Sequence, residues 1–203
     1  MKLYYMPGAC SLASHIALKE VGIAFDIEKV DTQNRKTETG ADFAAVNPKN
    51  KVPVLALDEG EVLTEGPAIL QHIADSFPDA NLTASPGMLA RVRVNEHLTY
   101  VSSELHPAFG PLFTPSATEE QKQAAREAVA KKLDYINSVL SDGREYLVEN
   151  RFTIADAYLF VVTNWTSFND ITLDKWAHLA EYMKRVASRT TVQAALKTEG
   201  LLG

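Results

Sequence analysis

The sequence has a single cysteine, no long apolar run and no excess of basic residues. One cysteine excludes an intrachain disulfide and suits a reducing compartment. Because a signal peptide and an apolar run of bilayer-spanning length are both lacking, we expect a cytoplasmic protein outside the membrane. Twenty basic and 26 acidic residues give a formal net charge of −6 without a basic patch, so nucleic acid is not an expected partner.

The sequence does contain enough apolar residues for folded domains. Its 203 residues are 46% hydrophobic, which allows a sizeable core in one large or two small domains. It has no repeats and no low-complexity segments. The organisation of the chain therefore has to come from the order of its strand and helix signals.

The first twenty residues predict a strand, a tight turn and a helix. The strand lies in the run Lys2–Met6, and Pro7-Gly8 is a strong turn signal. From Ser11 to Glu20 apolar residues recur at helical spacing, and Gly22 follows as a glycine that ends the helix. The only cysteine, Cys10, falls at or just before the first helical turn.

The position of Cys10 leaves two interpretations open. Unpaired N–H groups and the positive end of the dipole stabilise an anion at a helix start, which predicts a reactive thiol with a depressed pKa. The adjacent Ser11 offers a hydroxyl donor. A lone cysteine is also commonly a small buried hydrophobe. The residues alone favour neither interpretation.

The next segment completes a small α/β domain. A strand at Phe25–Val30 is expected to pair in parallel with the first strand through a right-handed crossover. Pro53 starts a strand, where proline is tolerated, and is a candidate for a cis peptide bond. The basic residues of the polar segment 31–51, Lys49 among them, are interpreted mostly as a solvated face. The remaining elements are a helix near Asp42–Val46, a strand at Val52–Leu57, a hairpin turn at Asp58–Gly60, a strand at Val62–Thr64 and a helix from Pro67 to Phe77.

Beyond residue 87 helix signals replace strand signals. Thr118 and Gln121 form one capping box, and Thr153 and Asp156 form a second. The helix after the second box runs to Trp165 and is apolar nearly all round, so we expect it at the buried centre of a helical domain. The other expected helices are Met88–His106, limited by Pro107, a helix from Thr118 to near Gly143, Trp176–Ala187 and Val192–Lys197.

Four segments resemble the signatures of one family, in matching order and spacing. They are YYMPGACSLASHIAL, NPKNKVPVL, LTEGPAIL and FTIADAYLF. Through them the whole chain resembles the cytosolic glutathione transferases, and most closely the bacterial beta class. The resemblance implies an α/β thioredoxin-like N-terminal domain (βαβαββα) at residues 1–78, a linker at 79–87 and an all-α C-terminal domain at 88–203. It also implies a homodimer with one glutathione site per subunit.

The resemblance implies a glutathione site built mainly on the N-terminal domain. Cys10 takes the position of the cysteine that contacts the glutathione sulfur and can form a mixed disulfide with it. Pro53 matches the family's cis-proline, which makes Val52 the residue whose backbone pairs with the cysteinyl part. Glu65 and Gly66 match the pair that holds the γ-glutamyl group, whose ammonium and carboxylate suit an acidic side chain and helix-start N–H groups.

Further positions follow from the same resemblance. Arg35 matches a basic position near the glycyl carboxylate, and His106 matches a histidine of the second domain that faces the sulfur. Thr99, Ser103 and Glu104 fall one helical face away from that histidine, at spacings of three or four. The resulting assignment is catalytic for Cys10, Ser11 and His106, and glutathione-binding for Arg35, Val52, Pro53, Glu65, Gly66, Thr99, Ser103 and Glu104.

Three positions depart from the common pattern of the family. Gly66 stands where a serine is common and offers only its backbone N–H. Pro107 stands where a lysine is common, which removes a positive charge and an N–H donor. Thr99 stands where an asparagine is common. The subsite for the electrophile is expected between the domains, with a lining of Phe109, Phe113 and Trp165.

The implied activity is the addition of the glutathione thiolate to a small hydrophobic electrophile, a detoxification reaction. One alternative is a glutathione-dependent thiol–disulfide reductase in which Cys10 attacks. Another is a non-enzymatic module that binds apolar ligands or protein partners. The joint presence of Cys10, Glu65 and His106 argues against the module. Glutathione is the expected co-substrate, and no metal is expected.

Overall fold

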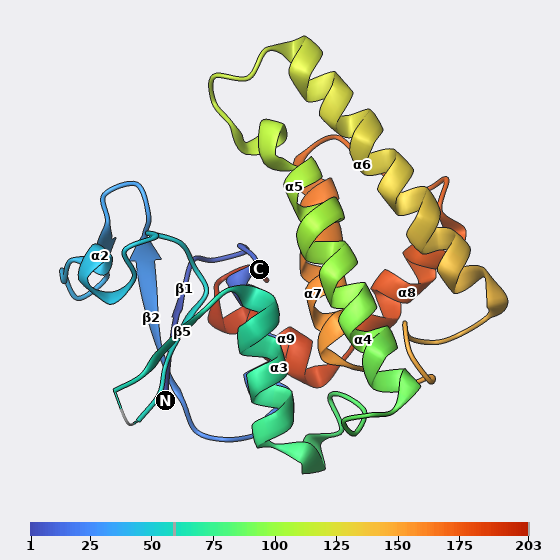
Figure 1. Cartoon of the computed structure of the whole chain (residues 1–203). Helices are drawn as coiled ribbons and strands as arrows, with labels where there is room; N and C mark the ends of the chain where they lie inside the picture. Colours follow the sequence, from blue (N-terminus) through green and yellow to red (C-terminus); the bar gives the residue numbers. More distant parts are fainter. Residues whose placement is uncertain (59, 203) are drawn as a thin grey trace. The chain divides into compact units, whose positions relative to one another are not determined.

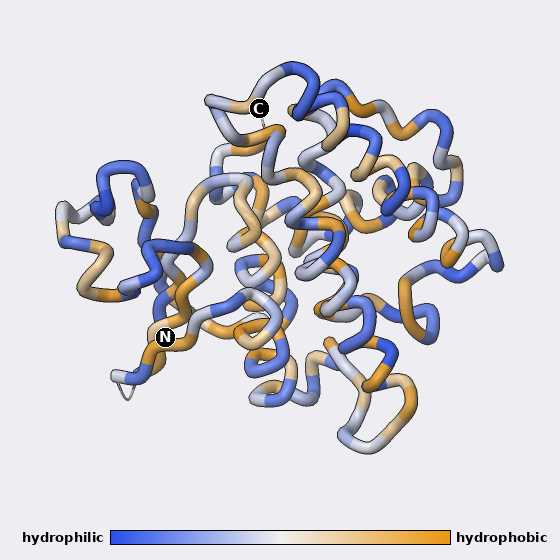
Figure 2. The backbone as a smooth tube through the Cα atoms, turned by 45° about the horizontal axis from the view of Figure 1, so that its top comes forward, coloured by the Kyte–Doolittle hydropathy of each residue, from blue (hydrophilic) through white to orange (hydrophobic). Residues whose placement is uncertain are grey.

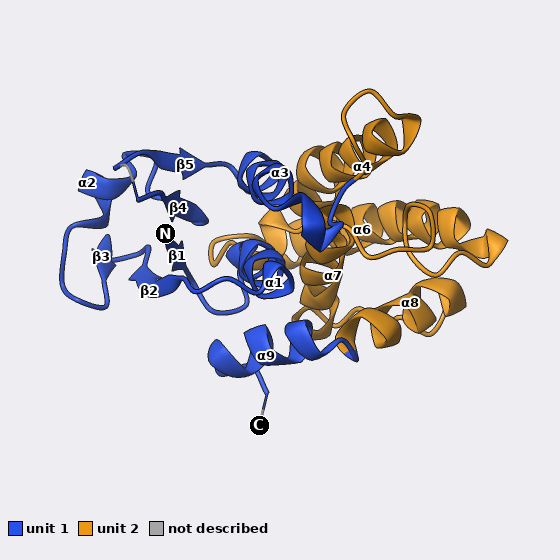
Figure 3. Ribbon diagram, turned by 90° about the horizontal axis from the view of Figure 1, so that it is seen from below, with its two compact units in different colours: residues 1–83, 188–203 blue, residues 84–187 orange. Residues whose placement is uncertain are grey.

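The computed structural model describes residues 1–58 and 60–202, which form two compact units (Figure 3). Unit 1 consists of residues 1–83 and 188–203, and unit 2 consists of residues 84–187. The predicted hairpin turn at Asp58–Gly60 includes Glu59, which lies outside the described residues. Within the described ranges, each helix is too short or too polar to cross a bilayer.

Unit 1 is built around a mixed sheet (Figure 1). Its strands are β1 (Lys2–Tyr5), β2 (Asp26–Asp31), β3 (Lys36–Thr37), β4 (Val54–Ala56) and β5 (Val62–Thr64). Among the described residues the strand order is β3-β2-β1-β4-β5. Since β1 pairs in parallel with β2 and antiparallel with β4, the predicted βαβ unit is confirmed. The sequence did not predict β3, because two residues are too few to show a period.

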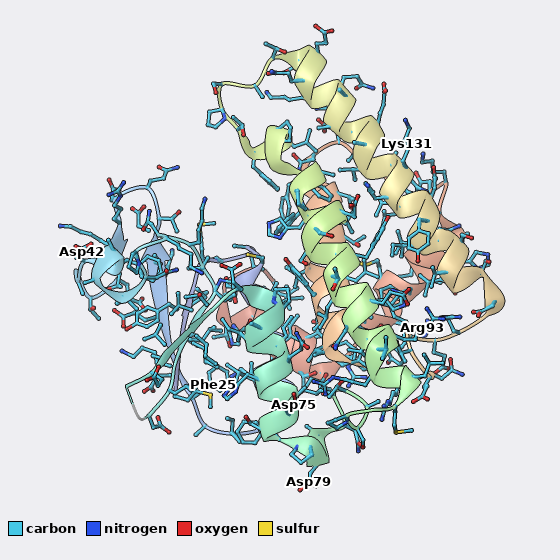
Figure 4. The ribbon with its side chains drawn as sticks, viewed as in Figure 1. Phe25, Asp42, Asp75, Asp79, Arg93 and Lys131 are labelled. Atoms are coloured by element: carbon cyan, nitrogen blue, oxygen red, sulfur yellow. The ribbon has the colours of Figure 1, made fainter. Side chains whose placement is uncertain are left out.

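The helices of unit 1 pack on its sheet or on one another. They are α1 (Ser11–Val21), α2 (Phe43–Val46), α3 (Gly66–Ser76) and α9 (Thr190–Thr198). Because α1 packs against both α3 and α9, every residue from Ser11 to Leu18 is buried. Gly22 ends α1 in the left-handed region with φ 78°, as predicted. Asp42, labelled in Figure 4, caps α2 by accepting a hydrogen bond from the Ala44 N–H.

Helix α9 belongs to unit 1 although it follows the helical segment in sequence. Arg189, just before α9, donates to the Glu20 carboxylate of α1 over 2.7 Å. His15 of α1 and Glu199, which follows α9, are buried and 2.8 Å apart. These contacts tie the end of the chain to α1. Unit 1 is therefore discontinuous in sequence, whereas the predicted domains are continuous stretches.

Unit 2 is helical in its described residues. Its helices are α4 (Leu89–Tyr100), α5 (His106–Ala108), α6 (Glu119–Val139), α7 (Ile154–Asn164) and α8 (Ala177–Ala187). Every residue of α7 from Ile154 to Thr163 is buried. Helices α4 and α8 both pack on α7, so its predicted place at the buried centre is confirmed. The sheet in unit 1 and the helices in unit 2 confirm the predicted fold class.

Both predicted capping boxes are present. Thr118 Oγ1 accepts a hydrogen bond from the Gln121 N–H, and Gln121 Oε1 accepts one from the Thr118 N–H. At the start of α7, the Asp156 carboxylate accepts a hydrogen bond from the Thr153 N–H over 2.8 Å. These reciprocal bonds satisfy N–H groups that have no partner within the helix. Short local motifs of this kind are visible in sequence because they need no distant partner.

The helical chain after residue 88 does not stop at Pro107. Helix α4 leads into a π-helical turn at Val101–Leu105, and α5 continues to Ala108. In a regular α-helix Pro107 would clash with the Ser103 carbonyl and leave it without a donor. The wider π-turn just before the proline changes this spacing. The helix therefore includes Pro107 and ends one residue after it, close to the predicted limit.

Candidate functional site

Cys10 lies where the turn after β1 meets the start of α1. The residue is half-buried, and its backbone already has helical angles of φ −56° and ψ −22°. Its thiol donates a hydrogen bond to the Val52 carbonyl oxygen over 3.4 Å. The Val52–Pro53 peptide bond is cis. The structure thus brings Cys10 together with Val52 and Pro53, which are 42 residues away from it in the sequence.

The Cys10 thiol has a higher pKa than its position at a helix start suggests. Burial raises the pKa of the Cys10 thiol to about 11. The backbone N–H groups of Cys10 and Ser11 lower this pKa, while the nearby Glu65 carboxylate raises it. The prediction of a depressed pKa is therefore wrong, because loss of solvation outweighs the helix-start N–H groups. The protonated thiol acts as a hydrogen-bond donor.

We predict slow alkylation of Cys10 at neutral pH. With a pKa of about 11, only about one thiol in ten thousand is ionised near pH 7. The rate with iodoacetamide should rise about tenfold for each pH unit between about pH 7 and 10. Free glutathione is the control, since its thiol has an ordinary pKa. A rate for Cys10 that levels off below about pH 8 would contradict the raised pKa.

Ser11 is buried, and its hydroxyl contacts the backbone of Met6. Its Oγ accepts a hydrogen bond from the Met6 N–H and donates one to the Met6 carbonyl, both over 3.2 Å. The Ala9 N–H donates to the same carbonyl. These bonds close the turn between β1 and α1. In this structure the Ser11 hydroxyl therefore shapes the turn that carries Cys10.

Glu65 and Gly66 lie at the start of α3. Glu65 has φ 70° and ψ 114°, a region that side chains rarely adopt. Its exposed carboxylate is 2.6 Å from Lys49 Nζ, which also donates to Thr64 Oγ1. A Cβ atom on Gly66 would stand 3.9 Å from Pro53 Cγ. The structure thus brings Glu65, Gly66 and Pro53 to one end of the sheet.

Lys49 is a residue whose part in this region the sequence analysis missed. Its place in the polar segment 31–51 predicts only a solvated face. The pairing of β4 with β5 brings the segment before β4 beside the segment after β5, and so brings Lys49 to Glu65. The predicted hairpin already implies that Lys49 and Glu65 are close, because the two chain segments that flank a hairpin lie side by side.

Arg35 lies at the other edge of the sheet. It stands just before β3, whereas Glu65 follows β5, and these strands are the two edges in the strand order. Arg35 has φ 55°, its carbonyl accepts a hydrogen bond from the Phe43 N–H, and its side chain is exposed. The loop around it is largely hydrophilic (Figure 2). The structure does not bring Arg35 into contact with Cys10 or Glu65.

In unit 2, His106 packs among aromatic side chains at the start of α5. Its Nδ1 is 2.8 Å from the hydroxyl of Tyr158, a buried residue of α7. Its ring centre lies 4.7 Å from that of Trp165 in an edge-on arrangement. Burial lowers the pKa of His106. The imidazole is therefore neutral near pH 7.

The three aromatic residues predicted to line the electrophile subsite lie together in unit 2. Trp165 stands at the centre, 5.6 Å from Phe109 and 5.4 Å from Phe113 between ring centres. Phe109 is fully buried, whereas 52% of Phe113 is exposed. His106 contacts the same tryptophan. The cluster thus combines a half-buried imidazole, one exposed phenyl ring and an aromatic core.

Thr99, Ser103 and Glu104 are exposed residues on the helix before His106. Ser103 Oγ donates to the Thr99 carbonyl over 2.9 Å, so these two residues are neighbours. The Glu104 carboxylate pairs with Lys132 of α6 instead. The π-turn at Val101–Leu105 breaks the regular spacing of three or four, so the helical face assumed in the sequence analysis is not continuous.

Two further features concern ligands. A pocket of about 630 Å³ lies in unit 2 between the segment after His106 and α6, with Pro107, Ala124 and Ala128 in its lining. The lining includes none of the predicted site residues.

The described residues, 1–58 and 60–202, contain no group of three or more His, Cys, Asp or Glu side chains arranged to hold a metal ion.

Comparisons with known proteins agree with this arrangement. The model of the glutathione S-transferase N-terminal domain matches residues 8–76, and that of the C-terminal domain matches residues 100–190. The chain is 48% identical to glutathione S-transferase GstA of Escherichia coli O157:H7, over 99% of this chain and 100% of that protein. The fold and these matches therefore define a glutathione S-transferase.

Comparison with solved structures identifies the class within the glutathione S-transferase family. A beta-class glutathione S-transferase of Sphingomonas chungbukensis is 50% identical, with a TM-score of 0.96 and full coverage of both chains. A sphingomonad glutathione S-transferase solved in complex with glutathione is 47% identical, with a TM-score of 0.95 and full coverage of both chains. The chain belongs to the glutathione S-transferase family, in its bacterial beta class, and is a transferase enzyme. The predicted resemblance is confirmed.

Proposed function

We propose that unit 1 binds glutathione beside Cys10 and that the enzyme adds the glutathione thiolate to small hydrophobic electrophiles. The observation that carries this proposal is the hydrogen bond from the Cys10 thiol to the Val52 carbonyl, next to the cis Val52–Pro53 peptide. We assign the Val52 backbone to the cysteinyl part of glutathione. A tripeptide held there has its sulfur next to Cys10.

The ends of glutathione need groups of both signs. The Glu65 carboxylate is exposed and already holds a cation, Lys49, so it suits the γ-glutamyl ammonium. The N–H groups at the start of α3, including that of Gly66, suit the γ-glutamyl carboxylate. The exposed Arg35 side chain is assigned to the glycyl carboxylate. Because Arg35 lies away from Glu65 in the sheet, these assignments spread glutathione across the strand ends.

In this proposal Cys10 stays protonated. A thiol with a pKa of about 11 is a poor nucleophile near pH 7 but a competent hydrogen-bond donor. A donor beside the glutathione sulfur favours the ionised form of that sulfur and so lowers the pKa of the glutathione thiol. The raised pKa therefore favours conjugation over a reductase mechanism in which Cys10 itself attacks.

We propose that residues of unit 2 complete the reaction. The neutral His106 donates a second hydrogen bond to the glutathione sulfur, and Phe109, Phe113 and Trp165 bind the electrophile. Thr99, Ser103 and Glu104 stay proposed glutathione contacts. Since Ser103 donates to the Thr99 carbonyl and Glu104 pairs with Lys132, both side chains must exchange these partners to reach a ligand.

We further propose a cytoplasmic homodimer. The start of α4 exposes three apolar side chains close in sequence: Met88 at 53%, Leu89 at 69% and Val92 at 58%. Exposed apolar residues gathered in this way commonly mark a protein interface. A second copy of the chain is the partner that the proposal assigns to them.

The test of glutathione binding is the variant Glu65→Gln. We expect its Kd for glutathione to rise about tenfold or more, because a hydrogen bond between charged groups contributes about 1.5–3 kcal/mol. Isothermal titration calorimetry measures the Kd. The control Asp79→Asn removes an exposed carboxylate beyond the other end of α3, as Figure 4 shows, and should leave the Kd unchanged. Equal Kd values for both variants and the wild type would refute the assignment of Glu65.

A further inference from the structure

His106 is held by a residue that the sequence analysis did not single out. The hydroxyl of Tyr158 lies 2.8 Å from His106 Nδ1, and Tyr158 is 96% buried within α7, the buried central helix of unit 2. Figure 1 shows α7 running alongside α4, whose chain continues into α5. Helix α5 begins at His106. Because Tyr158 belongs to the buried helix α7, its hydroxyl has a fixed position beside His106 Nδ1.

We propose that Tyr158 is a positioning residue that donates its hydroxyl proton to His106 Nδ1, so that the imidazole carries its own proton on Nε2. The inference deepens the proposed function and rests on it, because it gives His106 a defined task. A neutral imidazole has one N–H and one acceptor nitrogen. If Nδ1 accepts, Nε2 must donate, and His106 is then a hydrogen-bond donor toward a thiolate and not a proton acceptor.

The direction of the Tyr158–His106 hydrogen bond follows from acidity. A phenol has an ordinary pKa of about 10, and a neutral imidazole gives up its remaining proton far less readily. The phenol is therefore the better donor of the two. The imidazole nitrogen is in turn a better acceptor than the phenol oxygen. Both preferences place the shared proton on the tyrosine and leave Nδ1 as the acceptor.

The surroundings keep His106 neutral, so that its tautomer matters. Its ring packs edge-on against Trp165, which carries no charge. Glu104, two residues earlier, is paired with Lys132 of α6, and Tyr158 is the titratable group that contacts the ring from α7. Burial then lowers the pKa of His106. A neutral ring presents either a donor or an acceptor at Nε2, and the tyrosine decides which.

The variant Tyr158→Phe removes only the hydroxyl. We expect Nδ1 to lose its donor and the two tautomers to mix, so that kcat for conjugation falls about two- to tenfold, because only the rings that keep a proton on Nε2 still donate to the sulfur. The KM for glutathione should change little. The pH profile of kcat should also shift, since a ring without its fixed donor titrates differently.

Tyr182→Phe is the matched control. Tyr182 is another buried tyrosine of unit 2, and its hydroxyl donates to Asp156 over 3.0 Å and not to a histidine. Its removal should lower stability while leaving kcat and its pH profile unchanged. If both variants change kcat and the pH profile alike, the effect of Tyr158 is structural and the proposal fails.

The most direct readout is the ¹⁵N NMR spectrum of the histidine rings in the wild-type enzyme. Because this measurement uses the unaltered protein, misfolding of a variant cannot affect it. His106→Gln identifies the resonances of His106. The proposal predicts a protonated Nε2 and an unprotonated Nδ1, and the reverse pattern overturns it. This readout does not need glutathione, so it tests the Tyr158–His106 proposal separately from the proposed function. The proposed function fails if the wild-type enzyme neither binds glutathione nor conjugates it.

Discussion

Replacing Asp156 by alanine is expected to lower the free energy of unfolding by at least about 3 kcal/mol. Its fully buried carboxylate accepts hydrogen bonds from the Leu147 N–H, from the N–H and hydroxyl of Thr153, and from the Tyr182 hydroxyl. Alanine would leave these buried donors without a partner. Since the donors come from the loop before α7, from its cap and from α8, the whole of unit 2 should loosen. Urea unfolding measures the loss.

The second capping box provides the control for this prediction. Gln121 occupies the same position in the box at the start of α6, but it is exposed, and water can replace it. Gln121→Ala should therefore cost about 1 kcal/mol or less. Equal losses for Asp156→Ala and Gln121→Ala would show that the buried network adds nothing to an ordinary helix cap.

Replacing Cys10 by alanine should lower kcat/KM for conjugation by about tenfold to a hundredfold, whereas serine should restore most of it. The reason is that Cys10 acts as a donor, and a hydrogen bond to a charged sulfur contributes about 1.5–3 kcal/mol. A serine hydroxyl donates as a thiol does but cannot form a disulfide. Steady-state kinetics with an aryl halide measures both variants.

The same pair of variants separates the mechanisms. If Cys10 were the attacking atom of a reductase, the serine and alanine variants would be equally inactive toward a mixed disulfide. Recovery with serine would favour the donor. Full loss of conjugation in both the serine and the alanine variant would contradict the role of Cys10 as a hydrogen-bond donor to the glutathione thiolate.

The sequence predicts those parts of the fold that depend on local signals. The strand, turn and helix around Cys10, the glycine that ends α1 and both capping boxes are present in the structure. Each is specified by a few adjacent residues, through periodicity or through a side chain that bonds its own helix start. The order of these elements predicts a small α/β domain followed by a helical domain, and the resemblance to a known family adds that the first is thioredoxin-like.

Features that depend on distant partners were not predictable in this way. The raised pKa of Cys10 comes from burial that only the packed fold creates. The Lys49–Glu65 pair needs the β4–β5 hairpin, and the Tyr158–His106 contact joins residues 52 positions apart. Passage of the helix through Pro107 depends on a π-turn, for which no sequence signal was recognised. Local sequence patterns specify helices, strands and turns, whereas the ionisation of a side chain follows from its surroundings in the folded protein.

The central claim is that glutathione, and not Cys10, supplies the thiolate. The most direct measurement is the ultraviolet absorbance of a thiolate, recorded near pH 7 before and after glutathione is added to wild type and to Cys10→Ser. We predict no thiolate signal in the free enzyme, because the Cys10 pKa is about 11, and a signal of one thiolate per bound glutathione in both proteins. A signal in the free wild-type enzyme that Cys10→Ser abolishes would contradict the claim.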